Sequence, residues 1–287
     1  MPTKNIGHNS GFVDVHVHVE DALGLEAVRA AGIAAVRDAG TRNGAGLGIS
    51  GTGRRGEKPL VVSAGRALSK EGGYGSHFGT PVGTRDEIKS QIGRLKKAGA
   101  GIIKIMASGI VSLRRPGSIT TGGFTAEEIE YIIGEAARLG LAVMAHANGE
   151  SAVISAARAG VRSIEHGFIM TRKSLEAMAK GGTFWTPTVG ALARASDSGA
   201  VSAEAKAYIS GLIRTHLEMI GCAHAMGIPL AIGTDCVLPC REYEKAYAAE
   251  LSFFEQAGLP RDMVFQIACK GGAKLLGIVP EPRICTN

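Results

Sequence analysis

Residues 12–20 read FVDVHVHVE and alternate in the manner of a β-strand. Because successive side chains of a strand point to opposite faces, Asp14, His16 and His18 are predicted on one face and the valines on the other. A strand that only packs in a core has no use for two imidazoles two residues apart. A metal site does, since imidazole nitrogens are common ligands of divalent ions. This stretch therefore predicts a strand that delivers metal ligands.

From this strand onward, strand-like and helix-like stretches alternate along the chain. Thr84 is the expected N-cap of one helix, and Thr125 with Glu128 forms a capping box at the start of another. The expected strands are residues 12–18, 34–40, 59–68, 101–108, 141–146, 161–166, 183–189 and 228–235. Eight such units predict a (β/α)8 TIM barrel. A doubly wound open sheet is the alternative fold, but no GxGxxG turn follows the first strand.

Length and composition favour one domain with a small-molecule substrate. The 287 residues are 45% hydrophobic, which supports a single core over 1–287, with 1–10 as a lead segment and 279–287 as a tail. The net charge of +6 is spread along the chain, which argues against nucleic-acid binding. The five cysteines form no CxxC pair, residues 1–11 lack the apolar core of a signal peptide, and no apolar run is long enough for a membrane-spanning helix. We therefore expect a soluble cytoplasmic protein that does not bind membranes.

Polar side chains stand at or near the ends of five expected strands that are otherwise apolar. They are His16, His18, Lys104, His146, His166 and Asp235. Functional residues of a barrel gather at the C-terminal ends of its strands. Lys104 is predicted to point into the barrel, because Ile103 and Ile105 would face the helices. Four imidazoles and a carboxylate suit zinc or a similar divalent ion, and a neutral Lys104 could react with CO₂ to give a bridging carbamate.

The ordered set HxH, Lys, His, His, Asp resembles the amidohydrolase superfamily over essentially the whole barrel. Within it, IIKIMASG (102–109), AHANG (145–149), SIEHG (163–167) and IGTD (232–235) are similar to the prolidase-like and carboxypeptidase-like branch. The resemblance implies two divalent metal ions, with zinc expected. One ion would be bound by His16, His18 and Asp235 and the other by His146 and His166. A carbamate on Lys104 would bridge the two.

The expected activity is hydrolysis of an amide-like C–N bond by a metal-bridging hydroxide, with Asp235 carrying the proton to the leaving amine. The resemblance implies a dipeptide or an N-acyl amino acid as substrate. A deaminase, a lactonase, or a hydrolase of carbamates, ureas or organophosphates are alternatives on the same site. A catalytically silent barrel that binds a ligand is the alternative outside enzymes.

Substrate contacts are expected from loops at the mouth of the barrel. Tyr74 and His77 lie in the loop after the third strand, where relatives often carry a histidine at the position of Tyr74. Arg114 and Arg115 follow the fourth strand and could pair with a substrate carboxylate, although solvated arginines are an equal alternative. The small β-sandwich of many relatives is expected to be absent or truncated. A homo-oligomer could cover the surface thus left open.

Overall fold

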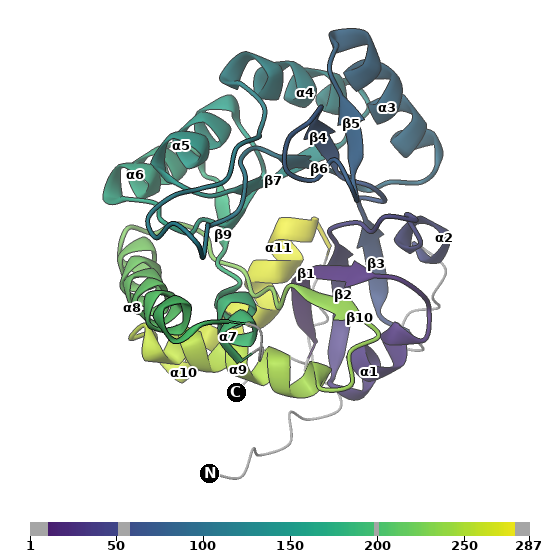
Figure 1. Cartoon of the computed structure of the whole chain (residues 1–287). Coiled ribbons are helices and arrows are strands. Elements are labelled where there is room, and N and C mark those ends of the chain that lie inside the picture. Colours follow the sequence, from purple (N-terminus) through teal and green to yellow (C-terminus); the bar gives the residue numbers. More distant parts are fainter. Residues whose placement is uncertain (1–10, 51–57, 198–200, 279–287) are drawn as a thin grey trace.

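The computed structural model describes residues 11–50, 58–197 and 201–278, so the expected lead and tail segments lie outside the described residues. Figure 1 shows a ring of strands with helices arranged around its outer side. All strand pairs of the two sheets are parallel. This arrangement is TIM-barrel-like, and it confirms the predicted fold class.

The strands form two sheets. The first has the order β10-β1-β2-β3, with β10 at Cys236–Leu238, β1 at Phe12–Val19, β2 at Ile33–Asp38 and β3 at Leu60–Ser63. The second has the order β5-β4-β6-β7-β8-β9, with β5 at Thr80–Val82, β4 at Leu68–Lys70, β6 at Ile102–Met106, β7 at Ala142–Ala147, β8 at Ser163–His166 and β9 at Phe184–Thr186. The expected third strand is therefore divided into β3 and β4.

Isolated hydrogen bonds, rather than continuous ladders, join the two sheets. On one side the amide of Gly101 donates to the carbonyl of Ser63 over 3.0 Å. On the other side, the segment 228–235 runs between β9 and β1. Ala231 N donates to Trp185 O over 3.0 Å, and Val15 N donates to Ile232 O over 2.8 Å. The ring of strands is thus complete in its order but not closed by regular pairing.

The eighth strand lies later than the sequence predicts. Residues 228–235 form an isolated bridge between Leu230 and Trp185 and single backbone hydrogen bonds to β1, and the regular ladder with β1 begins at Cys236. The reason is local: the amide of Thr234 donates to the carboxylate of Asp14 instead of to a neighbouring strand. Asp235 then adopts a left-handed backbone with φ of 56°, which interrupts the extended course of the chain.

Helices cover the outer side of the strands. They are α1 (Gly24–Ala30), α2 (Gly46–Ile49), α3 (Arg85–Lys97), α4 (Ala126–Arg138), α5 (Glu150–Ala159), α6 (Arg172–Gly181), α7 (Val189–Asp197), α8 (Ala203–Ala225), α9 (Tyr243–Gln256), α10 (Arg261–Gln266), a π-helical turn (Ile267–Gly271) and α11 (Gly272–Leu276). Thr84 and Thr125 form the capping boxes of α3 and α4, as predicted. Within the described ranges, no helix has the length and apolar character needed to cross a bilayer.

A small apolar floor fills one end of the ring, below the site. It contains Val13 and Val15 of β1, Phe184 of β9 and Leu275 of α11, which lies behind the ring in Figure 1. The predicted faces of β1 are therefore partly wrong. A register shift between Asp14 and Val17 lets Val15 and His16 both face the interior.

The sequence pattern predicts Asp14 on the same face as the two histidines, and this is wrong. Its carboxylate accepts a hydrogen bond from the hydroxyl of Tyr243 at the start of α9, over 2.9 Å. Val17 and Val19 belong to the large core between strands and helices. The bulge thus separates an apolar end of β1 from the end that carries His16 and His18.

Candidate metal centre

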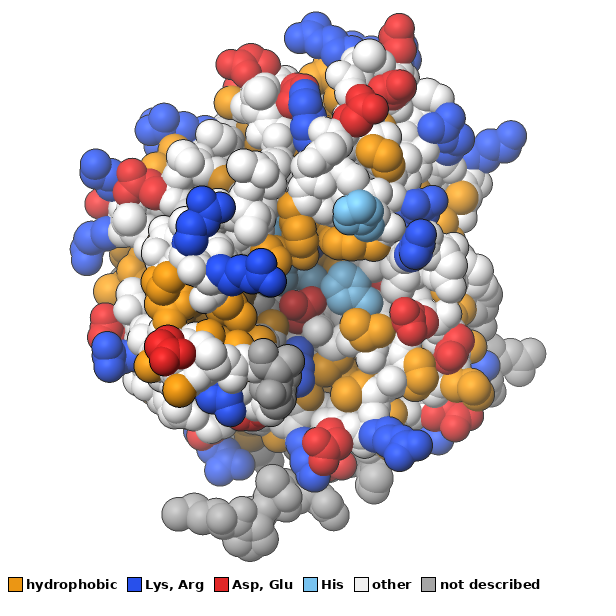
Figure 2. Space-filling view, in the orientation of Figure 1, with side chains coloured by type: hydrophobic (Ala, Val, Ile, Leu, Met, Phe, Trp, Pro, Cys, Tyr) orange, Lys and Arg blue, Asp and Glu red, His pale blue; other side chains and the backbone are white. Residues whose placement is uncertain are grey.

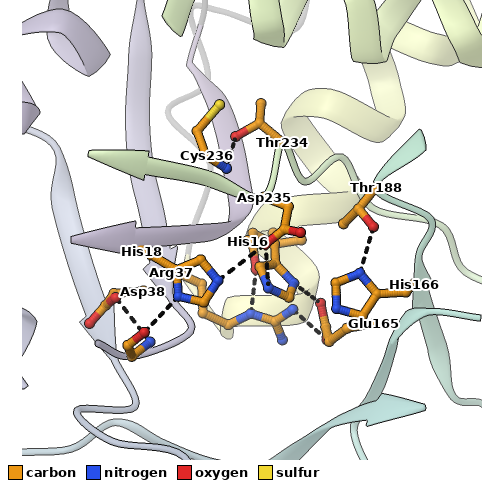
Figure 3. A network of polar contacts seen from close by, with 12 residues as sticks. His16, His18, Arg37, Asp38, Glu165, His166, Thr188, Thr234, Asp235 and Cys236 are labelled. Atoms are coloured by element: carbon orange, nitrogen blue, oxygen red, sulfur yellow. Dashed lines mark hydrogen bonds and ion pairs between the residues drawn. The ribbon is translucent and has the colours of Figure 1, made fainter. Parts of the chain in front are cut away.

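His16, His18 and Asp235 form a compact group, here called the three-ligand cluster. One ligand atom from each residue lies within 4.8 Å of the other two. Asp235 Oδ1 is 3.1 Å from His18 Nε2 and 3.4 Å from His16 Nε2 (Figure 3). The side chains of His18 and Asp235 are 25% and 22% exposed, so the cluster is open to solvent from the mouth. Two imidazole nitrogens and one carboxylate oxygen are a suitable donor set for zinc.

The outer nitrogens of both imidazoles are already occupied. His16 Nδ1 lies 2.8 Å from Glu165 Oε2, and His18 Nδ1 lies 2.6 Å from the carbonyl oxygen of Gly40. Both partners are acceptors, so each Nδ1 carries the proton. In His16 the lone pair is therefore on Nε2, which is the arrangement that a metal ion at the cluster requires. In His18, Nε2 also lies 3.1 Å from the carboxylate oxygen Oδ1 of Asp235. Against the effect of burial, this hydrogen bond and the charge of Asp235 raise the pKa of His18, so a metal ion would displace a proton from this nitrogen.

His146 and His166 lie next to the three-ligand cluster and can serve a second ion. The ring centroid of His166 is 5.1 Å from that of His16 and 4.7 Å from that of His146. The hydroxyl oxygen of Thr188 accepts from His166 Nδ1 over 2.8 Å, and the carbonyl of Gly109 accepts from His146 Nε2 over 3.0 Å. These contacts leave His166 Nε2 and His146 Nδ1 as the nitrogens with free lone pairs.

Two of the candidate ligands have strained backbones. His166 has φ of 69° and Asp235 has φ of 56°, a region that residues other than glycine rarely adopt. In β8, Ile164 packs in the outer core while Glu165 faces the interior, so His166 in a regular strand would turn outward. The left-handed backbone brings its ring inward instead. Such strain persists where the surrounding structure holds a residue for function.

Lys104 is buried at the centre of the site, with 1% of its surface exposed. Burial lowers its pKa from 10.5 to about 8, despite the attraction of Glu165 and Asp235. Among the described residues it forms no ion pair. Lys104 thus has an amine that is neutral in a large fraction of molecules near pH 8. A neutral amine is the form that can react with CO₂.

The remaining charges suit metal binding as well. Burial, and then the charge of Lys104, lowers the pKa of His16 to about 4 and that of His146 to about 3. The pKa of Asp235 lies well below its usual value, because neighbouring histidines outweigh the effect of burial. At neutral pH His16 and His146 are therefore neutral and Asp235 is ionised, which are the protonation states that ligate metals. The pKa of His18 is raised by Asp235 in spite of burial, so metal binding there would release a proton.

Three buried carboxylates outside the ligand set hold the three-ligand cluster in place, and sequence reasoning assigned none of them this role. Glu165 contacts His16. Asp38 accepts from the amide of Gly40, whose carbonyl contacts His18. Asp14 accepts from the amide and hydroxyl of Thr234, next to Asp235. The signal in the sequence is an acidic residue inside an otherwise apolar strand, as in VRDAG (36–40) and SIEHG (163–167).

The predicted substrate contacts are arranged unequally around the mouth. The ring of Tyr74 lies 5.0 Å from that of His146, and burial, with the nearby charge of Asp235, raises its pKa to about 12. His77, Arg114 and Arg115 are exposed and lie in the segments that follow β4 and β6. Figure 2 shows a hollow in this face, with histidine and acidic side chains inside and hydrophobic side chains around it. Of the four predicted residues, Tyr74 is the one in contact with a candidate ligand.

Comparisons with known proteins agree with this site. Residues 10–280 match the family described as the amidohydrolase family. Ochratoxinase of Aspergillus niger is 29% identical over 204 residues, which are 62% of this chain and 42% of that protein. This chain therefore spans less than half the length of that curated relative.

Solved structures share the fold. The crystal structure of an amidohydrolase has a TM-score of 0.75 and 28% identity, covering 94% of this chain and 75% of that one. A Xaa-Pro dipeptidase with methionine bound in its active site has a TM-score of 0.75 and 23% identity, with the same coverage of 94% and 75%. At its level of identity, the dipeptidase supports the fold alone.

Proposed function

The chain belongs to the amidohydrolase family, and from this premise we propose that it is a metal-dependent hydrolase of an amide-like C–N bond. The observation that carries the proposal is the three-ligand cluster. Two imidazole nitrogens and one carboxylate oxygen converge within 4.8 Å at the ends of β1 and of the segment before β10. A barrel without such a function would gain nothing from burying three imidazoles and a lysine around one point.

The residues of the site fit two divalent ions, and we propose zinc. His16, His18 and Asp235 would hold one ion, and His146 and His166 the other. Lys104, as its carbamate, would supply the anionic bridge, which its buried and unpaired amine favours. When bound, such ions polarise a carbonyl oxygen and lower the pKa of water toward neutrality.

The chain's own groups then account for proton movement. Asp235 is ionised and partly open to solvent, so it can accept a proton from the attacking water and donate it to the leaving amine. The ring of Tyr74, beside His146, is placed to contact a substrate at the mouth. His77, Arg114 and Arg115 are further candidates, with the arginines suited to a carboxylate.

A dipeptide or an N-acyl amino acid is the substrate class that we propose. The names of two similar proteins support it, since one is a Xaa-Pro dipeptidase and another an ochratoxinase.

The partner would thus be a small molecule, with no nucleic acid or membrane involved. A cytoplasmic location fits the free thiols of Cys222, Cys236 and Cys240. A homo-oligomer is also proposed, and sedimentation at micromolar concentration tests it.

The testing experiment measures metal per chain by plasma mass spectrometry, with bicarbonate present, followed by a screen of dipeptides and N-acyl amino acids. About two divalent ions per chain and chelator-sensitive release of free amino acid would support the proposal. Release of ammonia instead would indicate a deaminase. A well-folded protein that holds no metal and hydrolyses no member of the panel would leave a silent ligand-binding barrel as the better hypothesis.

A further inference from the structure

A fully buried arginine crosses the interior of the barrel just below the three-ligand cluster. Arg37 of β2 and Glu165 of β8 both have 0% exposure, and Arg37 Nη2 donates to Glu165 Oε1 over 2.7 Å. The interior of such a barrel is usually filled by apolar side chains. A buried ion pair is seldom the more stable choice, because apolar residues of similar volume avoid the cost of desolvation. The position of the pair therefore calls for another explanation.

Two contacts of this pair lead to His16. The second oxygen of Glu165, Oε2, contacts Nδ1 of His16 over 2.8 Å. Arg37 Nε donates to the carbonyl oxygen of Val15 over 2.6 Å, and Val15 is the residue before His16 in the bulge of β1. Arg37 Nη1 donates to Ser163 Oγ over 2.8 Å, and that hydroxyl donates to Glu165 Oε1. Figure 3 shows Arg37 reaching from one side of the barrel toward Glu165 beneath His16.

We propose that Arg37 and Glu165 are positioning residues for His16, and that they set the metal affinity of the three-ligand cluster. Arg37 fixes the backbone of the bulge, which turns His16 inward. Glu165, held in its rotamer by Arg37 and Ser163, fixes the ring and its tautomer. Loss of either residue lets the ring turn or places the proton on Nε2, where it blocks the ligand lone pair.

The inference rests on the proposed metal centre but not on the bond that the enzyme hydrolyses. Its first test therefore uses metal-free protein. Nitrogen-15 NMR of the imidazoles, with His16 assigned by comparison with His16→Gln, reports which ring nitrogen carries the proton. In the wild type we expect the proton on Nδ1. In Glu165→Gln and Arg37→Met we expect a mixture of both tautomers. A pair that only filled the barrel would leave this spectrum unchanged.

The second test measures zinc affinity by competition with a chromophoric chelator. We expect Glu165→Gln and Arg37→Met to weaken binding of the first ion about 10- to 100-fold. We also expect the double variant to be little worse than Glu165→Gln, since both residues act on one ring. Thr188→Val is the matched control, because it removes the contact to His166 and leaves the three-ligand cluster intact.

Ser163→Ala keeps the proposal testable if the charge variants do not fold. It removes the hydroxyl that joins Arg37 to Glu165 and changes no charge. We expect a roughly two- to tenfold loss of zinc affinity, the size of one hydrogen bond. Folded variants with the wild-type tautomer and wild-type zinc affinity would overturn the assignment. A shifted tautomer without detectable zinc binding in the wild type would retain the positioning role and reject the metal centre.

Discussion

Replacing Lys104 with methionine should stabilise the metal-free protein against unfolding. In the presence of zinc, the same change should abolish binding of the proposed second metal ion. In the folded protein, burial lowers the pKa of Lys104 from 10.5 to about 8. That difference means that burial of the protonated side chain lowers the stability of the folded protein by about 3 kcal/mol at pH 7. Methionine has a similar length and carries no charge. The variant should therefore unfold with a free energy about 3 kcal/mol higher at pH 7.

The pH dependence of this difference follows from the direction of the change in pKa. Between about pH 8 and pH 10.5 the unfolded chain binds more protons at Lys104 than the folded chain does. The wild type therefore gains stability with rising pH, and the advantage of Lys104→Met shrinks across this window.

Urea denaturation in bicarbonate-free buffer with a chelator, at pH 7 and at pH 10, measures the effect. Lys70→Met is the control, because Lys70 is 34% exposed and its pair with Glu128 should contribute less than about 1 kcal/mol. With bicarbonate and zinc present, metal content should fall from about two ions per chain to one or fewer in Lys104→Met. A variant less stable than the wild type at pH 7, with unchanged metal content, would refute the reasoning.

Three other changes test separate parts of the site. Asp235→Asn should lower kcat on the order of 100-fold or more, because an amide cannot accept the proton; turnover within a few-fold of wild type would contradict this. Thr188→Val should weaken binding of the second zinc ion about tenfold, as measured by mass spectrometry after dialysis, because the ring of His166 loses its partner. Burial raises the pKa of Glu250 from 4.5 to about 8. The protonated side chain therefore contributes stability that is fully present below pH 4.5 and is lost as pH rises through 8. Glu250→Gln should flatten this pH dependence of the free energy of urea unfolding. An unchanged pH profile in the variant would contradict the prediction.

Much of the architecture could be predicted because its strands and helices depend on local sequence patterns. The alternation of apolar runs and capped helices predicts parallel strands in a barrel-like ring, and the capping boxes of Thr84 and Thr125 are found as expected. The positions of the polar strand ends predict that the candidate ligands gather at one end of the barrel, since the carboxyl ends of parallel strands lie together. The resemblance to the amidohydrolase superfamily implies that His16, His18 and Asp235 form one group, and the structure brings these three together. Lys104 points inward between Ile103 and Ile105, as the period of a strand requires.

The residues that hold the candidate ligands, and the backbone conformations that orient them, could not be predicted in the same way. A strict alternation places Asp14 beside His16, and a bulge that adds one residue to the register reverses this assignment without any mark in the sequence. The left-handed backbones of His166 and Asp235 likewise change where a side chain points.

The sequence by itself thus determined the fold class and the set of candidate ligands, because periodicity and residue chemistry act within a few neighbours. Only the tertiary structure decided which carboxylate holds which ligand. Glu165 and His16 are 149 residues apart in the chain, and Asp14 and Thr234 are 220 apart. Such side-chain contacts depend on how the whole ring of strands assembles. Hydrogen bonds between residues so far apart in the chain produce no local sequence pattern from which they could be predicted.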